Sequence, residues 1–260
     1  MQKKLRYINR VILVTLLLSL GPLLVFASGK TVVGGDWRNA NRESSNIAPK
    51  PAEHSDAVIQ IYSARTFSWR GLFASHTWIA TKNKNEQNYT VYQVIGWRGL
   101  WKLPVLSIQK DVPDRYWFGQ RPTVIKSFYG AEAEKLIPKI EQAAASYPYK
   151  EKYILWPGPN SNTFTAFIAR QIPELQLSLP SIAIGKDFLG KNKFFAKAPS
   201  GTGYQFSFYG IFGILLARDE GLEINIIGLV FGINPLKLSI TLPGLGSFGL
   251  HLANSQTVYN

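Results

Sequence analysis

Three early segments of the chain, residues 57–64, 73–80 and 89–97, are mostly apolar. These segments are rich in β-branched and aromatic residues, and together the two signals predict strands. A polar turn at 82–88 separates the second segment from the third, so we expect these two strands to pair antiparallel. The mixed polar and aromatic stretch 103–129 is typical of a loop-rich connection with one short strand.

Apolar residues recur at helical spacing in residues 130–146 and put one apolar face on a predicted helix. That face is formed by Leu136, Ile137, Ile140, Ala143 and Ala144. A second helix is expected to follow the loop Trp156–Phe164 and to end near Pro173, which cannot continue it. The predicted fold is α+β, with helices packed on an antiparallel sheet in a domain covering residues 57–204.

The last part of the chain, residues 205–260, is apolar and rich in glycine. Its apolar runs are too short to cross a bilayer as helices, and Phe206 and Phe208 alternate with Ser207 as in a strand. We therefore expect a β-rich extension packed on the preceding domain. A buried sheet is the default expectation for its apolar residues, and a surface apposed to a membrane is the alternative.

The N-terminal segment has a different pattern. The basic residues Lys3, Lys4, Arg6 and Arg10 precede an apolar run over 11–27, which is typical of an export signal or a retained membrane anchor. Either form places the rest of the protein outside the cytoplasmic membrane. The polar, proline-containing stretch 28–56 is expected to be a linker or a strap over the domain.

Composition narrows the chemistry. The chain has a net charge of +13 but scatters its lysines, so a basic surface facing anionic lipid or envelope polymer is favoured over nucleic-acid binding. It has no cysteine, which excludes thiolate zinc sites and a cysteine nucleophile. Its three histidines, His54, His76 and His251, show no metal-binding spacing. We expect neither a metal nor another cofactor.

The loop Trp156–Phe164 places a small hydroxyl residue, Ser161, at the predicted start of a helix. Helix N-termini carry unpaired N–H groups and a partial positive charge, so they stabilise an anion. Ser161 is therefore a candidate nucleophile, framed by Trp78, Trp156, Asn160 and Asn162. The alternative is a capping loop without chemistry, because asparagine and serine are favoured helix caps.

His76 is the candidate base, because it opens an apolar strand where a side chain can be held rigidly beside a cleft. The alternative is a core histidine that packs on Trp78 or on another ring. Reflection across the predicted hairpin puts Gln93 opposite His76 as the residue that orients it. A register shift by one would put Tyr92 or Val94 there instead.

The order of these features resembles the circularly permuted papain-like peptidases of the permuted NlpC and PPPDE types. In those families a histidine opens an early strand, and an Asn-Cys-Asn-aromatic segment begins a later helix, as Asn160–Phe164 does here with Ser161 in place of cysteine. The Ile172-Pro173 pair after the helix also fits the pattern. Across most of its length the chain further resembles an uncharacterised family of bacterial envelope proteins, a domain of unknown function, which implies a location in the cell envelope on the periplasmic side of the inner membrane.

The resemblance implies a permuted papain-like core with a nucleophile at Ser161 and a base at His76. Serine needs stronger base assistance than cysteine and an oxyanion hole, which backbone N–H groups at the helix start would supply. One hypothesis is an envelope hydrolase or acyltransferase acting on an amide or ester bond. The other is an inactive relative that binds peptide, glycan-peptide or lipid. In both, residues 11–27 would be the contact with the membrane.

Overall fold

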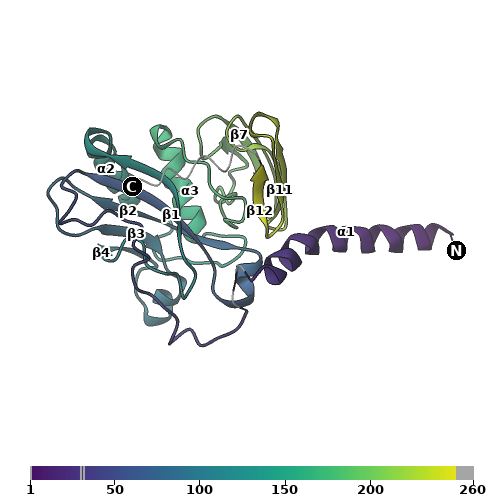
Figure 1. Ribbon diagram of the computed structural model, residues 1–260. Coiled ribbons are helices and arrows are strands. Elements are labelled where there is room, and N and C mark those ends of the chain that lie inside the picture. The colour runs from purple at the N-terminus through teal and green to yellow at the C-terminus, as the bar shows by residue number, and fades with distance from the viewer. Residues whose placement is uncertain (1, 30, 32, 250–260) are drawn as a thin grey trace.

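The computed structural model describes residues 2–29, 31 and 33–249, apart from the side chains at 2, 11, 14 and 17. It contains two antiparallel sheets with helices between and beside them (Figure 1), so the fold is α+β. Residues 250–260, which include His251 and the end of the expected C-terminal extension, lie outside the described residues.

The first sheet has five strands in which every neighbouring pair is antiparallel. In spatial order the strands are β4 (Leu106–Lys110), β3 (Thr90–Val94), β2 (Ser75–Lys82), β1 (Val58–Arg65) and β5 (Thr123–Tyr129). The three strands predicted from the segments rich in β-branched and aromatic residues, and the hairpin between the second and the third, are confirmed. The stretch 103–129, expected to hold one short strand, contains both β4 and β5. The side chains of β5 are largely half-buried and do not alternate clearly, so its sequence carries little strand signal.

Two helices cover one face of this sheet. They are α2 (Gly130–Ala145) and α3 (Ser161–Gln171), and their apolar sides form the largest hydrophobic cluster together with residues of β1, β2 and β3. The apolar face predicted for residues 130–146 is the buried face of α2. Short 3₁₀ turns continue the chain elsewhere: η1 (Ser68–Leu72), η2 (Gly96–Trp101), η3 (Pro173–Leu175) and η4 (Pro235–Lys237).

The opposite face of the first sheet is covered by the strap that precedes β1. Asp114 holds the strap in place, since its carboxylate accepts the backbone N–H groups of Ile47 at 2.6 Å and Ala48 at 3.1 Å. Ser45 Oγ donates to the Asp114 carbonyl at 2.7 Å. Ile47 and Ala48 pack on a second hydrophobic cluster that includes residues of β1, β2 and β3. The first sheet is therefore buried on both sides.

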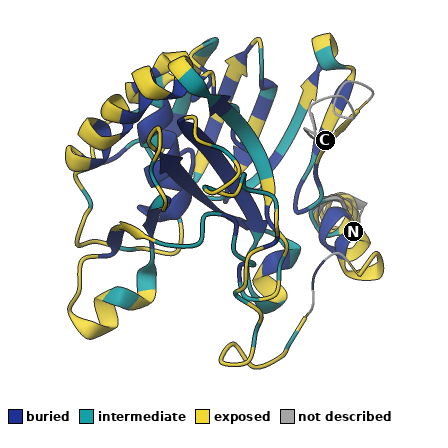
Figure 2. Cartoon of the chain, turned by 60° about the vertical axis from the view of Figure 1, so that its left-hand side comes forward, coloured by how far each residue is buried: buried dark blue, intermediate teal, exposed yellow. Residues whose placement is uncertain are grey.

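The second sheet has seven strands and begins before residue 205. Its strands are β6 (Phe195–Lys197), β7 (Gly203–Phe208), β8 (Phe212–Ala217), β9 (Gly221–Ile226), β10 (Leu229–Asn234), β11 (Ser239–Leu242) and β12 (Gly246–Gly249), paired in sequence order. In Figure 2 the central strands of the first sheet are almost wholly buried, whereas the strands of this C-terminal sheet alternate between buried and exposed positions.

In the C-terminal sheet the apolar side chains were expected to be buried, but many of them are exposed and the polar ones point inward. In β8, for example, Phe212, Ile214 and Leu216 are exposed, while Gly213, Leu215 and Ala217 are buried. Polar side chains of β7, β9 and β11 point inward and are buried: Gln205, Ser207, Glu223, Asn225, Ser239 and Thr241. The expectation of a sheet with its apolar residues buried is therefore wrong.

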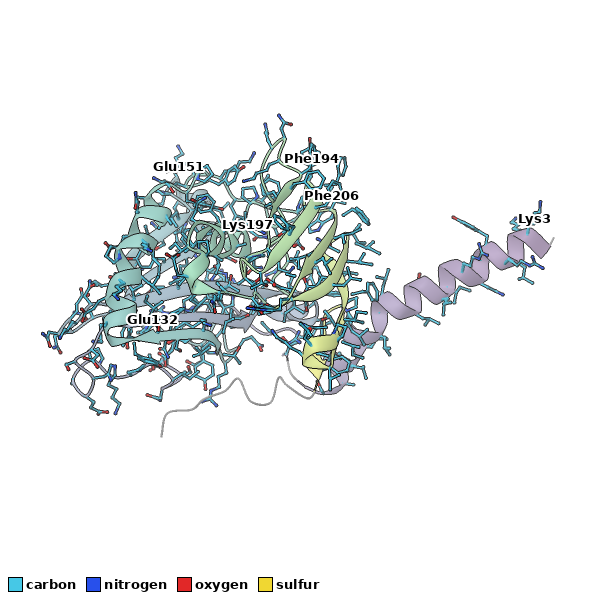
Figure 3. The ribbon with its side chains drawn as sticks, turned by 90° about the horizontal axis from the view of Figure 1, so that it is seen from above. Lys3, Glu132, Glu151, Phe194, Lys197 and Phe206 are labelled. Atoms are coloured by element: carbon cyan, nitrogen blue, oxygen red, sulfur yellow. The ribbon has the colours of Figure 1, made fainter. Side chains whose placement is uncertain are left out.

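The N-terminal helix α1 (Gln2–Ala27) leaves the body beside the turn between β11 and β12 and extends away from it (Figures 1 and 3). The contact is close, since a Cβ atom at Gly21 would lie 1.8 Å from the Pro243 carbonyl oxygen. Over the described residues, the structure contains no helix with the length and apolar character needed to cross a membrane.

Candidate functional site

The loop before α3 is organised by Asn160. Its side-chain oxygen accepts the backbone N–H groups of Asn162 at 3.0 Å and Thr163 at 3.1 Å, and the Thr163 hydroxyl accepts the Asn160 N–H in return. This is a capping box, in which the first orphan donors of the helix are satisfied reciprocally. The Asn160 side-chain amide also donates to the carbonyls of Leu155 and Ile184, both at 3.0 Å.

The same end of α3 is bonded to β2. Asn162 donates to the Ser75 carbonyl at 2.9 Å and to the Ile184 carbonyl at 2.8 Å, and its side-chain oxygen lies 2.9 Å from Thr77 Oγ1. Thr77 Oγ1 is also 2.9 Å from Thr165 Oγ1. Asn160 and Asn162 therefore tie the loop, the helix and the sheet together.

Ser161 is the first residue of α3 and is buried, with 5% of its surface exposed. Its hydroxyl forms no hydrogen bond with any described residue. An oxyanion hole at this helix start would need free backbone donors, but those of Asn162 and Thr163 are bonded to Asn160 Oδ1 and that of Phe164 to the Asn160 carbonyl. The backbone N–H groups that made Ser161 a candidate nucleophile are thus largely engaged in the helix cap.

His76 and Gln93 are brought together, but not as directly opposed residues, because β2 and β3 pair only from Ile79–Tyr92 to Thr81–Thr90. Gln93 Oε1 accepts a long hydrogen bond from His76 Nε2 at 3.4 Å, and both residues are buried. The His76 ring stacks on Trp117, with centroids 3.6 Å apart and planes 9° from parallel, and more loosely on Trp78 at 5.6 Å. Burial lowers the pKa of His76 to about 3, and the bond to Gln93 opposes this only partly.

The structure does not bring His76 and Ser161 together. Successive side chains of a strand point to opposite faces of its sheet. Thr77 faces α3, where it meets Asn162 and Thr165, so its neighbour His76 faces the strap side with Trp78 and Trp117. The sheet therefore separates the predicted base from the predicted nucleophile, and Gln93 orients a histidine that does not reach Ser161.

The two predicted framing tryptophans lie in different places. Trp78 is buried, stacks on Tyr62 and donates its Nε1–H to the Pro113 carbonyl at 2.7 Å. Trp156 is 45% exposed and packs against the turn between β9 and β10, where a Cβ atom at Gly228 would lie 2.9 Å from its Nε1. Trp156 therefore marks a junction between the first domain and the C-terminal sheet, and Trp78 belongs to the core.

A surface depression of about 310 Å³ lies elsewhere, between β4 and the end of α2. Its lining includes Leu106, Ile108, Ala144 and Lys150, and none of the predicted site residues contributes to it.

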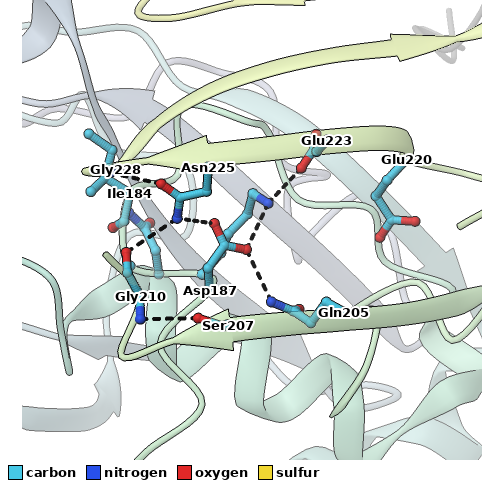
Figure 4. Close-up of polar contacts among 12 residues, drawn as sticks. Ile184, Asp187, Gln205, Ser207, Gly210, Glu220, Glu223, Asn225 and Gly228 are labelled. Carbon is cyan, nitrogen blue, oxygen red and sulfur yellow. Dashed lines mark hydrogen bonds and ion pairs between the residues drawn. The ribbon is translucent and has the colours of Figure 1, made fainter. Parts of the chain in front are cut away.

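A buried ion cluster under the C-terminal sheet was not found by sequence reasoning (Figure 4). Lys186 donates to Asp187 at 3.1 Å and to Glu223 of β9 at 2.7 Å. Asp187 also accepts from Gln205 at 3.3 Å and from Asn225 at 2.9 Å. Burial lowers the pKa of Lys186, but the two carboxylates outweigh this and hold the pKa above its ordinary value. The signal in the sequence was the set of polar residues alternating with apolar ones in β7 and β9.

Arg170 extends this cluster to α3. It donates to Gln205 Oε1 at 2.5 Å and to the carbonyls of Lys186 at 3.0 Å and Lys197 at 3.1 Å. Burial lowers the pKa of Arg170 to about 10, against the opposing effect of nearby Asp187 and Glu220. The polar inner face of the C-terminal sheet is thus matched by charges on the first domain, which explains why the sheet buries its polar side.

Comparison with known proteins gives one match. The model of the family described as a protein of unknown function (DUF3750) matches residues 56–188, just over half of the chain. No curated protein and no solved structure matches. The matched region runs from the start of the first sheet through α3 to the ion cluster, and it ends before β6. The chain belongs to the DUF3750 family.

Proposed function

We propose that this protein acts in the cell envelope by binding a peptide, a glycan-peptide or a lipid, and not by catalysis at Ser161. The observation that carries the proposal is the placement of His76 and Ser161 on opposite faces of the first sheet. A general base must come within hydrogen-bond reach of the proton it removes, directly or through one water.

Two further features agree with the absence of catalysis at this site. A histidine whose pKa is near 3 is a weak proton acceptor at neutral pH, because the best catalytic pKa lies near the working pH. The backbone donors of Asn162, Thr163 and Phe164 are all bonded to Asn160. A serine nucleophile needs both a base and such donors.

The papain-like arrangement and the envelope location stay predictions. The arrangement is supported by the order of a histidine-bearing strand, a partner strand and a helix that begins at Ser161. The orientation of His76, away from Ser161, argues against a catalytically active papain-like site. The location is supported by the basic residues that precede the apolar run 11–27.

The proposal is tested with a fluorophosphonate probe on the purified full chain. We expect no labelling of the wild type above that of Ser161→Ala. Labelling that disappears in Ser161→Ala and in His76→Gln would overturn the proposal. Binding is measured separately, as an increase in melting temperature with a short peptide, a muropeptide or phospholipid. If none of the three raises the melting temperature, the binding proposal is wrong.

A further inference from the structure

The outer face of the C-terminal sheet is lined by apolar side chains in rows that cross the strands. One row is Phe195, Phe206, Ile214, Ile224 and Phe231, each opposite the next in the strand register. A second row is Tyr204, Leu216, Leu222, Ile233, Ile240 and Phe248. A third is Phe208, Phe212, Ile226 and Leu229.

These residues are exposed or half-buried, and several are very exposed, such as Phe195 at 72% and Leu216 at 66%. Proteins rarely leave so continuous an apolar surface in water, and such surfaces mark contacts with a partner or a membrane. The inner face of the sheet is occupied by polar contacts with the Lys186 ion cluster and with Arg170, so these apolar side chains cannot be turned inward. The outward orientation is therefore built into the fold.

The charged residues around this apolar face indicate which kind of partner binds to it. Over residues 189–249 the exposed charged side chains are all basic: Lys191, Lys193, Lys197 and Arg218. The three acidic residues are shielded. Glu220 and Glu223 are buried, and Asp219 is half-buried and paired with Arg218 at 3.1 Å.

Lys197 is paired with Tyr204 across β6 and β7, so it lies at the edge of the apolar face itself. A flat apolar surface with a positive rim complements a membrane that contains anionic lipid. A face-to-face contact between two copies would set the same positive rims against each other.

Helix α1 adds a second apolar surface at the same side of the molecule. Its C-terminal end packs beside the turn between β11 and β12, and it extends away from the body on the side toward which the outer face of the sheet is turned (Figures 1 and 3). Leu16, Leu20, Leu23 and Phe26 are exposed on it. Its far end carries the exposed residues Lys3, Lys4, Arg6 and Arg10.

We propose that the outer face of the C-terminal sheet docks on a lipid bilayer that contains anionic phospholipid, beside helix α1. The apolar rows contact the acyl and headgroup boundary, and the basic rim contacts the anionic headgroups. Lipid binding is one form of the binding function proposed above, on which this inference rests. It is measured independently of any labelling of Ser161.

The test uses the absence of cysteine from the chain. A single cysteine at Leu216→Cys, on the apolar face, is labelled in the full chain with an environment-sensitive fluorophore. The matched control is Leu100→Cys on η2, a leucine that is 82% exposed and lies away from the C-terminal sheet. Ile240→Cys is a second probe of the same face. Circular dichroism and melting confirm that each labelled variant is folded.

With vesicles of phosphatidylcholine and phosphatidylglycerol, we expect a blue shift of the probe at Leu216 and Ile240 and none at Leu100. Vesicle binding through α1 alone would float the protein but leave the probes on the sheet unchanged, which would overturn the proposal. A shift without vesicles that grows with protein concentration, together with a dimer in sedimentation, would assign the face to a second copy and would also overturn it.

The lipid class is tested by charge. Phosphatidylcholine vesicles are expected to bind more weakly than vesicles with phosphatidylglycerol, and the difference should shrink at high salt. The double variant Lys193→Glu and Lys197→Glu should lose at least about tenfold in affinity for the anionic vesicles, since each basic residue near such a surface contributes about 1 kcal/mol. Lys84→Glu, in the polar turn of the first sheet, is the control. Equal affinity for both vesicle types would contradict the anionic preference.

Discussion

Thr77 Oγ1 lies 2.9 Å from Asn162 Oδ1, so it is Thr77 and not His76 that β2 presents to the start of α3. This contact decides the interpretation of the predicted site. It fixes the direction of every side chain along β2, because the faces of a strand alternate. It also puts His76 among the tryptophans under the strap.

Thr77→Val should destabilise the protein by about 1–3 kcal/mol, because the buried side-chain oxygen of Asn162 loses its hydroxyl partner. Thr77→Ser keeps a hydroxyl and should cost less. Both changes are measured by urea unfolding. A valine variant as stable as the wild type would mean that the contact contributes nothing to holding α3 on the sheet.

Acid should destabilise the protein through His76. The folded pKa of His76 is lowered from 6.5 to about 3, so the unfolded chain takes up a proton where the folded chain does not. The contribution of neutral His76 to the free energy of unfolding is fully present above pH 6.5 and declines as the pH falls toward 3, by about 1.4 kcal/mol per pH unit. His76→Gln should remove this part of the slope. His54→Gln, in the strap, should leave it in place.

The cap residue is expected to be among the costly polar positions. Asn160→Ala removes the acceptor for two backbone N–H groups and the donor to two carbonyls. The loss should be about 2 kcal/mol or more, which combines a lost cap with buried groups left unpaired. Asn88→Ala, at an exposed position in the polar turn, serves as the control and should change the free energy of unfolding very little.

Removal of the buried ammonium should loosen the C-terminal sheet. Lys186→Met leaves Asp187 and Glu223 buried without their cation, and such changes cost about 3–5 kcal/mol. Glu223→Gln keeps a hydrogen-bond acceptor for Lys186 and should cost less. Faster proteolysis within residues 189–249 would report the loosening directly. Lys191→Met, at an exposed site, should not change the cleavage rate.

The first sheet and its helices were largely predictable, because the signals are local. Runs of β-branched and aromatic residues placed β1, β2 and β3, helical spacing placed the buried face of α2, and the asparagines of the loop indicated a helix cap. Gln93 was also found near His76, because the two residues lie on adjacent strands of one hairpin, although the register does not pair them. Short strands such as β6, with three residues, carry too little pattern to be found.

What the sequence by itself determined is which side chains share a face, since the period of a strand or a helix follows from backbone geometry. It did not determine which face is turned inward. Alternation is the same for a strand that buries Thr77 against α3 and for one that buries His76 there. In the C-terminal sheet the face with the larger apolar side chains is exposed and the face with the polar side chains is buried. The polar face is buried because Lys186, Asp187 and Arg170 supply matching partners from distant parts of the chain. Only the tertiary structure brings those partners together. It shows that the loop at Ser161 stabilises the fold and that the apolar face of the C-terminal sheet is turned outward.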